Sequence, residues 1–584
     1  MKKIVISAAL LLCSVALIAQ NDNTYNESVV VKGSYTPVID QVEKINFPAQ
    51  ITDTLSRIEH TFHYSITPTR LRAMYEPTRI RAARIIGEPA TKLYNNYLRL
   101  GFGNYWTPMA DLYWCSTRDR LKTYGVRLNH LSSWDKLPDY GSNHFGNTGV
   151  TLFGKYIIGD VLQLSSDFSY EHDHNLYYGF TDNTLQTVLG LTRDDIRLAE
   201  YRASYNVASW NVGVKNMELD VNKLGYAAIL HLSDLWGVWG QNEMNLNLSG
   251  DVHYGFNIMN QYKGVAYLHA EWDAYRYDVS SDGLPLGRTT TPLLIDPNYV
   301  GNLVKVNPFA VFFFRGLDIH AGFTMGWNGL MNGHGTIFHF FPDITVSKKL
   351  MNDYFVLSIA ATGGLDVNSL NNIRKINPYV MPEISNWGSA SATSHYDFVG
   401  HARWTLSKKL EANAEVSYSL RENDITFMLS PYYALDNVYQ VAYNSLNRLA
   451  LGGDITFVND EMITLRAGGH YYHYNFTDIG AIQPVWSMYY RPNWDALVSA
   501  KVNYHNKWFF YLEGQLLGKM EADGGQTLPM RYGINAEVEY RHNRALSFFL
   551  KMDNLAFQRY WYWANYPSQR GLFLAGLTYT IPHK

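Results

Sequence analysis

The sequence is poor in cysteine, poor in charge and lacks long hydrophobic runs beyond its first residues. It contains 2 cysteines among 584 residues, Cys13 and Cys115. Because Cys13 lies in a segment that we expect to be removed, an internal disulfide is excluded in the mature chain. Charged residues make up 17% and the net charge is −3, which argues against a nucleic-acid-binding protein. After residue 19 no run of about 18 apolar residues occurs, so a helical membrane protein is excluded.

The first residues have the organisation of a secretory signal peptide. Lys2 and Lys3 form a basic region, Ile4 to Ile18 form an apolar region, and a cleavage site follows at Ala19. We therefore expect residues 1–19 to be removed on export. Acylation of Cys13 in a lipoprotein signal is the alternative, but Leu12 is larger than the residue that normally precedes such a cysteine.

Aromatic residues, in contrast, are abundant at 15%, and 44 of them are tyrosines. Many segments alternate strictly between apolar and polar residues, as in 162–171, 410–420 and 532–541. In 532–541, for example, Tyr532, Ile534 and Val538 share one face while Glu537 and Glu539 share the other. Side chains of a strand point alternately to its two faces, so these segments are predicted to be two-faced strands.

A soluble sandwich alternates in the same way, but two features favour a membrane barrel. The expected strands have about 11 to 14 residues, longer than the usual 5 or 6 and long enough for a tilted strand to cross a bilayer. The connectors are alternately short and long, with the longest at 172–205, 276–299, 365–394 and 421–445. Short periplasmic turns and long external loops are typical of an outer-membrane barrel. Lipid then covers the apolar outward faces.

We therefore predict an all-β transmembrane antiparallel up-and-down barrel over residues 95–584, with about 22 strands. The alternative is one extra strand within residues 172–205, around "LAEYRASY". The predicted strands are 95–103, 107–117, 121–132, 146–157, 160–171, 206–216, 223–233, 240–253, 262–275, 300–313, 316–326, 336–347, 353–364, 395–407, 409–420, 446–457, 461–474, 491–504, 507–519, 530–541, 545–555 and 571–581.

The C-terminal stretch "FFLKMDNLAFQRYWYW…SQRGLFLAGLTYTI" resembles the closing strands of TonB-dependent receptors. The resemblance rests on Asn554-Leu555 at a strand end, on Arg570-Gly571 before the last strand, and on that strand's alternation. Its expected outward row is Phe573, Ala575, Leu577, Tyr579 and Ile581. The sequence departs from the family in lacking a final Phe. The resemblance implies a barrel of about 22 strands, closed by this segment.

The segment "NESVVVKGSYTP" (26–37) is similar to the TonB box of the same family, in which an acidic residue precedes a run of valines. Glu27, Val29, Val30 and Val31 match that pattern, and Gly33 matches the residue that follows. The resemblance implies that these residues bind an energising periplasmic TonB-type protein. Residues 20–94 are too few for a full plug domain, so we expect a short periplasmic or lumenal segment there.

A barrel of about 22 strands has a wide lumen that must be filled. We consider three occupants, namely residues 20–94, inward-folded loops or a partner protein. Five arginines lie between residues 70 and 84, and Glu76 is their one acidic neighbour there: Arg70, Arg72, Arg79, Arg81 and Arg84. One interpretation is a solvated basic linker. The other is docking on lumenal carboxylates such as Glu411, Glu415, Glu537 and Glu539, because guanidinium groups bind carboxylates through two hydrogen bonds.

Catalytic and metal-binding patterns are weak. In "EHDHN" (171–175) the histidines and the acidic residues fall on opposite faces of a strand, and in "HYYHYN" (470–475) His470 and His473 do the same. We therefore expect no enzyme, no metal site and no cofactor. The run Tyr560-Trp561-Tyr562-Trp563 has two interpretations, an aromatic girdle at the membrane interface, which we favour, and a ligand-stacking surface.

Two functional classes are consistent with these features. The first is a plug-poor outer-membrane receptor that takes up or binds a ligand, together with partners such as a TonB-type protein. The second is a non-transporting subunit of a larger outer-membrane assembly complex, in which another subunit fills or caps the lumen.

Overall fold

The computed structural model describes residues 96–116, 119–159, 161–217, 223–258, 262–279, 286–288, 298–330, 337–351, 354–381, 392–460, 462–478 and 489–581. The signal peptide, the TonB-box-like residues and the arginine stretch 70–84 lie outside the described residues. Predictions about them therefore remain predictions.

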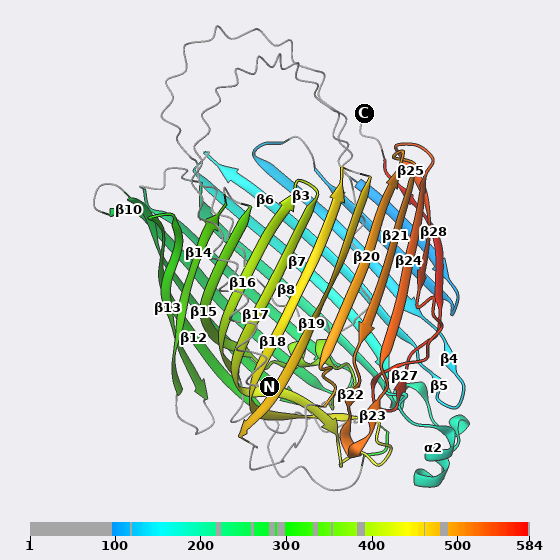
Figure 1. The fold of residues 1–584 in the computed structure, drawn as a ribbon. Helices are drawn as coiled ribbons and strands as arrows, with labels where there is room; N and C mark the ends of the chain where they lie inside the picture. The colour runs from blue at the N-terminus through cyan, green and yellow to red at the C-terminus, as the bar shows by residue number, and fades with distance from the viewer. Residues whose placement is uncertain are drawn as a thin grey trace, which may run out of the picture. The chain divides into compact units, whose positions relative to one another are not determined.

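The main sheet has 22 antiparallel strands and closes on itself, as predicted (Figure 1). Each strand pairs with the next along the chain, and the last pairs with the first. The strands are β1 Asn96–Gly103, β2 Thr107–Cys115, β3 Lys122–Ser133, β6 Phe145–Ile158, β7 Leu162–Leu176, β8 Arg202–Asn216, β9 Gly225–Gly237, β10 Gln241–Ile258, β11 Tyr262–Val279, β12 Tyr299–Phe314, β13 Leu317–Leu330, β14 Ile337–Leu350, β15 Phe355–Val367, β16 Ala392–Ser407, β17 Leu410–Leu429, β18 Tyr439–Asn459, β19 Ile463–Asp478, β20 Trp494–Tyr504, β21 Trp508–Leu517, β24 Arg531–Arg541, β25 Leu546–Asp553 and β28 Leu572–Tyr579.

The barrel closes where β28 pairs with β1, from Leu98 opposite Tyr579 to Gly103 opposite Leu574. Gly576 is required at this seam, because a Cβ atom there would lie 2.1 Å from the carbonyl oxygen of Leu100. The strands can therefore approach closely, and the seam leaves no unpaired edge in the apolar part of a membrane.

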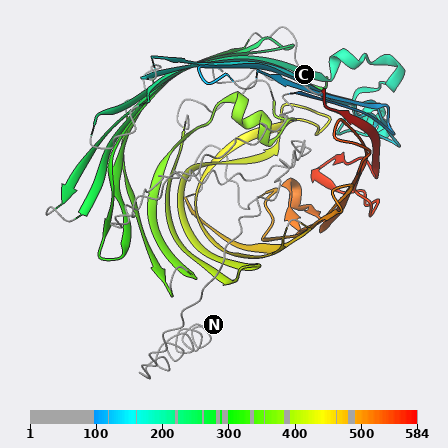
Figure 2. The same ribbon diagram turned by 90° about the horizontal axis from the view of Figure 1, so that it is seen from above.

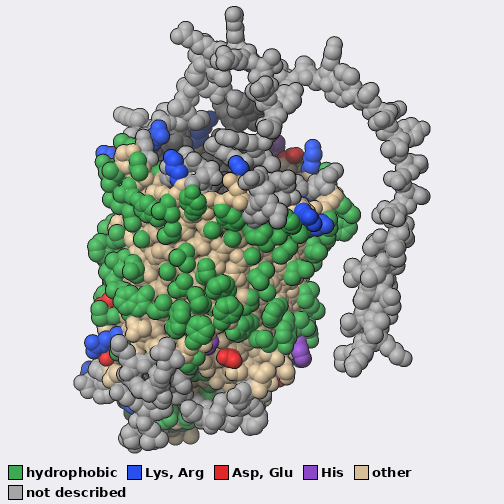
Figure 3. All heavy atoms as spheres, turned by 90° about the vertical axis from the view of Figure 1, so that its left-hand side faces the viewer, with side chains coloured by type: hydrophobic (Ala, Val, Ile, Leu, Met, Phe, Trp, Pro, Cys, Tyr) green, Lys and Arg blue, Asp and Glu red, His purple; other side chains and the backbone are tan. Residues whose placement is uncertain are grey.

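The two faces of the strands differ as the alternation predicted. On β17 the outward Val416 and Tyr418 are 51% and 41% exposed, whereas Ser417 and Ser419, which alternate with them, are buried. On β28 the outward Tyr579 is 41% exposed, whereas the inward Leu574 is 2% exposed. Figure 3 shows the resulting apolar surface across the outer wall. Lipid contact accounts for such a surface in a barrel.

Strand length varies strongly around the ring. β17 and β18 have 20 and 21 residues, whereas β1 and β28 have 8 each. The long strands continue past the predicted segments 409–420 and 446–457 at the end that carries the long loops. The extra strand considered within 172–205 is not found there: β8 instead begins at Arg202, after a short 3₁₀ turn at Leu198–Glu200.

The long loops carry short elements of their own. The helices are α2 Asp182–Leu189 and α3 Leu370–Ile376, and the 3₁₀ turns are η1 Arg193–Asp195, η2 Leu198–Glu200 and η3 Asp523–Gly525. The hairpin strands are β4 Lys136–Leu137, β5 Gly141–Ser142, β22 Met520–Glu521, β23 Thr527–Leu528, β26 Trp561–Trp563 and β27 Tyr566–Pro567. Among the described residues, no helix is both long and apolar enough to span a membrane. Figure 2 shows α3 inside the ring of strands and α2 outside it.

Candidate functional site

Several long loops pack together at the loop end of the barrel and form what we call the loop cap, residues 177–201, 368–381, 430–438, 489–493 and 554–571. Its helix α2 lies outside the ring of strands, whereas α3 lies inside it (Figure 2). In Figure 2 the light green helix α3 and the red segment around β27 lie within the ring. Their side chains join the upper strand residues in one buried core. Its fully buried members from the loops include Tyr177, Leu185, Leu370, Ile373, Val380, Tyr433 and Val438. Inward-folded loops, one of the three occupants considered from the sequence, therefore fill this end of the barrel.

Hydrogen bonds connect loops from opposite sides of the ring. The Tyr177 hydroxyl donates to the carbonyl of Val380 at 2.6 Å, and the Asn437 amide donates to the carbonyl of Tyr177 at 2.9 Å. The Tyr566 hydroxyl in turn donates to the carbonyl of Asn437. These contacts join the loops after β7, β15, β17 and β25, so the cap spans the lumen.

Aromatic rings fill the space between these hydrogen bonds. Tyr379 stacks on Tyr566 with ring centroids 3.5 Å apart, and Tyr178 meets the same ring edge-on at 5.0 Å. Aromatic pairs of this kind add about 0.5–1.5 kcal/mol beyond the burial of their surface. The loop cap is therefore a packed core in its own right.

The aromatic run 560–563 belongs to this cap, and its interpretation as a membrane girdle is wrong for Trp563. That side chain is 8% exposed and packs against Phe427 and Tyr490, at centroid distances of 5.1 and 4.8 Å. Tyr562 lies beneath the guanidinium of Arg531, 4.3 Å from ring centroid to Cζ. Alternation alone cannot distinguish lipid contact from contact with a loop core, because both bury apolar surface.

Helix α3 is fixed to the barrel wall at its N-terminus. Glu243 at the start of β10 is 5% exposed and accepts the backbone N–H of Leu370 at 2.5 Å and that of Asn371 at 3.3 Å. A carboxylate is favourable here because the first N–H groups of a helix lack partners and carry partial positive charge. From the same helix, the Arg374 guanidinium donates to Asp173 on β7 at 2.9 Å. We call this anchor the α3 seat.

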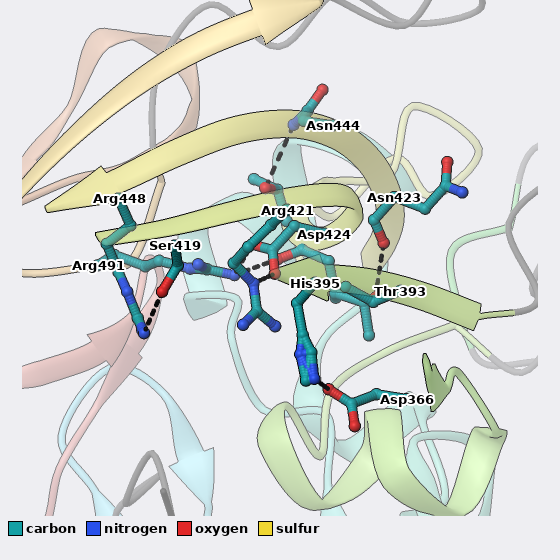
Figure 4. A network of polar contacts seen from close by, with 12 residues as sticks. Asp366, Thr393, His395, Ser419, Arg421, Asn423, Asp424, Asn444, Arg448 and Arg491 are labelled. Carbon is teal, nitrogen blue, oxygen red and sulfur yellow. Dashed lines mark hydrogen bonds and ion pairs between the residues drawn. The ribbon is translucent and has the colours of Figure 1, made fainter. Parts of the chain in front are cut away.

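On the opposite wall the buried Asp424 forms a second anchor, which we call the Asp424 seat (Figure 4). Its carboxylate receives Arg421 Nε at 2.6 Å and Arg491 Nη2 at 2.6 Å. Arg491, which precedes β20, also donates to the carbonyl of Ile425 at 2.7 Å. This seat therefore ties the loop before β20 to β17.

An irregularity in β17 makes this geometry possible. Residues i and i+3 of a regular strand point to opposite faces. Pairing with β18 shifts between Arg421 and Asp424, and Asn423 has a φ of 55°. Glu422 and Asn423 of β17 lie opposite the single residue Ser445 of β18, so β17 contains one extra residue there and Arg421 and Asp424 meet on the same side. The sequence signal is the polar run 421–424, which interrupts the alternation.

The network around the Asp424 seat continues through neutral and acidic partners. Arg448 donates to Ser419 Oγ at 3.2 Å, and Ser419 donates to Asp397. His395 lies between Asp397 and Asp366, at 3.6 and 4.0 Å. Arg421 and Arg491 thus share the carboxylate of Asp424, and Arg448 is linked to Asp397 through Ser419, which fits a structural joint better than an anion-binding site.

The carboxylates proposed to receive the arginine stretch lie on the lumen side of their strands, opposite the exposed apolar row. Glu537 is already engaged, because Arg99 Nη2 lies 2.7 Å from its Oε1. Arg99 also stacks on Phe549 at 3.9 Å. Glu411, Glu415 and Glu539 therefore remain as the candidate carboxylates for the predicted docking of Arg70, Arg72, Arg79, Arg81 and Arg84.

The histidine-containing motifs separate as the alternation predicted. Asn147 donates to both Glu171, at 2.8 Å, and Asp173, whereas His172 contacts Asn206 at 2.8 Å. His470 lies 3.0 Å from Asp495, and His473 belongs to the opposite face. Within the described ranges, no three His, Cys, Asp or Glu side chains are grouped to hold a metal ion.

Comparison with solved structures finds a similar barrel fold in several receptors. The ferric-catecholate import receptor Fiu from E. coli K12 matches with a TM-score of 0.60 and 11% identity, over 84% of this chain and 82% of that one. The siderophore receptor PirA from Acinetobacter baumannii matches with a TM-score of 0.61 and 10% identity, over 85% and 81%. A mutant of the ferric enterobactin receptor PfeA from Pseudomonas aeruginosa, in complex with enterobactin, gives 0.60 and 12%, over 85% and 82%.

No family model matches the sequence. No curated protein matches it either. The chain therefore has the barrel fold of these receptors, in agreement with the resemblance of its C-terminal strands to TonB-dependent receptors.

Proposed function

We propose that this protein is a receptor-type barrel of the outer membrane that takes up or binds a ligand, with the loop cap as its external gate. The observation that carries the proposal is the 22-stranded barrel, similar over most of its length to import receptors. The cap lies at the loop end, where a ligand arriving from outside first meets the protein. No catalytic role is part of this proposal.

The cap suits a gate because it is anchored at two separate places. The α3 seat and the Asp424 seat each join a loop to the wall through charged hydrogen bonds, whereas the centre is held mainly by aromatic packing. A ligand that binds the aromatic residues and releases one seat would shift the cap as a unit, because packed cores move between discrete arrangements.

We further propose that Glu27, Val29, Val30 and Val31 bind a periplasmic TonB-type protein that supplies the energy for opening. Support comes from the resemblance of this segment to a TonB box and from the receptor fold of the barrel. The arginines of 70–84 are proposed to dock on the lumenal carboxylates that remain available.

The test compares compounds consumed from the growth medium by a deletion strain and by strains that carry the wild type, Val30→Pro or Val42→Pro. We expect at least one compound to be consumed with the wild type and Val42→Pro, and spared in the deletion and with Val30→Pro. If the Val30→Pro strain still consumes that compound, the proposed coupling to a TonB-type protein is wrong, but the uptake proposal stands. If deletion spares no compound at equal barrel levels, the uptake proposal is wrong.

The second candidate function is a non-transporting subunit of an outer-membrane complex. The observation in its favour is that the cap already joins loops from opposite walls by buried hydrogen bonds, as in a permanently closed barrel. Purification of the tagged mature chain from native outer membranes in mild detergent separates the candidates. A stable partner at equal abundance supports the subunit role, whereas a lone barrel supports the receptor.

A further inference from the structure

The end of the barrel opposite the cap carries a concentration of exposed positive charge. Between β12 and β21, consecutive short turns present the side chains that we call the basic rim: Arg315, Lys348, Lys349, Lys408, Lys409 and Lys507. All six are exposed. Figure 3 shows lysine and arginine side chains along this upper edge, above the apolar band.

The charges of the basic rim are not neutralised within the described part of the chain. Lys409 Nζ donates to the amide oxygen of Asn459, a neutral group, and Arg315 lies over the ring of Phe314 at 5.2 Å. The carboxylates described on these turns and at their margins are few, among them Asp318 and Asp460, and neither forms an ion pair with the rim.

The loop end behaves differently. There Arg374 is paired with Asp173, and Arg421 and Arg491 are both paired with Asp424, while exposed cations such as Lys136 and Lys519 lie on separate loops. Positive charge on consecutive turns is therefore a feature of the turn end, and it favours an anionic partner from outside the described chain.

Exposed aromatic rings place the rim at the level of lipid headgroups. Tyr354, Trp404, Tyr504 and Trp508 border the same turns and are between 41% and 55% exposed. Amphipathic rings of this kind collect at the interface between lipid and water. The turns are tight, for example where the Lys507 N–H donates to the carbonyl of Tyr504 at 3.2 Å, so the lysines cannot extend far from that level.

From this arrangement we infer that the basic rim binds the phosphate groups of anionic phospholipids in the leaflet at the turn end. An ammonium or guanidinium group beside an apolar wall can hold a phosphate while the acyl chains lie against the barrel. An acidic periplasmic protein would approach from the aqueous side, and its binding would not require the positive charges to lie beside the lipid-facing wall of the barrel. The lipid is therefore the favoured partner, and this inference is independent of ligand uptake.

The test is native mass spectrometry of the full mature chain in detergent, titrated with phosphatidylglycerol or with phosphatidylethanolamine of the same acyl chains. The variant combines Lys348→Gln, Lys349→Gln, Lys408→Gln and Lys409→Gln. The matched control removes exposed charges from the loop end through Lys136→Gln, Arg197→Gln, Lys375→Gln and Lys519→Gln. Resistance of the unheated barrels to SDS verifies that each protein is folded.

We expect the wild type and the control to prefer phosphatidylglycerol and the variant to lose that preference by roughly tenfold or more. The preference of the wild type should also fall steeply as salt is added. The loss of preference in the variant and the salt dependence of the wild type must agree, and the salt dependence is measured without any substitution. An unchanged preference in the variant overturns the inference. The inference is also overturned if an acidic protein co-purifies with the wild type but not with the variant, while the variant still prefers phosphatidylglycerol.

Discussion

Arg421 and Asp424 form a 2.6 Å ion pair on one face of β17 although they are three residues apart in the strand. A bulge, in which Glu422 and Asn423 lie opposite the single residue Ser445, brings them together, and Arg491 completes the site from another loop. A local departure from strand geometry thus creates the anchor for one side of the loop cap.

Asp424→Asn is expected to destabilise the barrel by about 3–5 kcal/mol, because it leaves Arg421 and Arg491 without their buried counter-charge. The measurement is the temperature at which the folded, SDS-resistant form converts to the unfolded form. Glu422→Gln, at an exposed neighbour in the same bulge, is the control and should change that temperature little. Equal temperatures for the two variants would show that the ion pairs do not stabilise the barrel.

Glu243→Gln is expected to loosen helix α3 without unfolding the barrel. The amide oxygen can still accept one N–H, but the favourable charge at the helix N-terminus is lost, at a cost of about 1–2 kcal/mol. Hydrogen exchange at Leu370 and Asn371 should therefore become roughly tenfold faster. Glu200→Gln, on an exposed loop residue, serves as the control. Unchanged protection of α3 would contradict the role given to Glu243.

Trp563→Ala is expected to open the cap. Removal of a buried aromatic side chain costs about 3–5 kcal/mol where the surroundings cannot collapse, and here it removes ring contacts with Phe427, Tyr439 and Tyr490. Single-channel conductance in planar bilayers should rise relative to the wild type. Trp134→Ala, at a side chain that is 54% exposed, should conduct like the wild type. If Trp563→Ala also conducts like the wild type, the cap does not limit the pore.

The loop cap is also expected to lose stability at alkaline pH. Burial raises the pKa of Tyr177, Tyr178 and Tyr566 well above the ordinary value of 10.0. Their phenols stay protonated in the folded cap, whereas an unfolded loop releases those protons near pH 10. The folded cap binds more protons there, so its stability is complete below about pH 10 and falls as the pH rises.

Absorbance at 295 nm, which reports tyrosinate, should reveal a late and cooperative step that accompanies loss of the cap. In Tyr178→Phe this step should be smaller and shifted, whereas Tyr504→Phe, at a side chain that is 55% exposed, should leave it unchanged. Titration of all tyrosines as a single group near pH 10 would contradict the buried phenols.

The barrel could be predicted from the sequence because its signals are local. Alternation with a period of two depends on neighbouring residues, and short connectors distinguish one end from the other. The outward row of β28 and the number of strands followed from these signals alone. The prediction was weakest at strand ends: β17 and β18 continue well beyond the predicted segments, because packing against the cap stabilises strand residues that lie past the apolar band.

The sequence by itself thus determined a closed, lipid-facing barrel, since strand periodicity and the need to pair every backbone group in an apolar medium leave no other solution. Only the tertiary structure decided what fills the loop end. The cap brings together residues as distant as Tyr177 and Asn437, and Glu243 and Leu370. Contacts over such separations depend on the three-dimensional path of the loops, and no local pattern encodes them. For the same reason Trp563 resembled a membrane-facing aromatic in the sequence and proved to be part of a core.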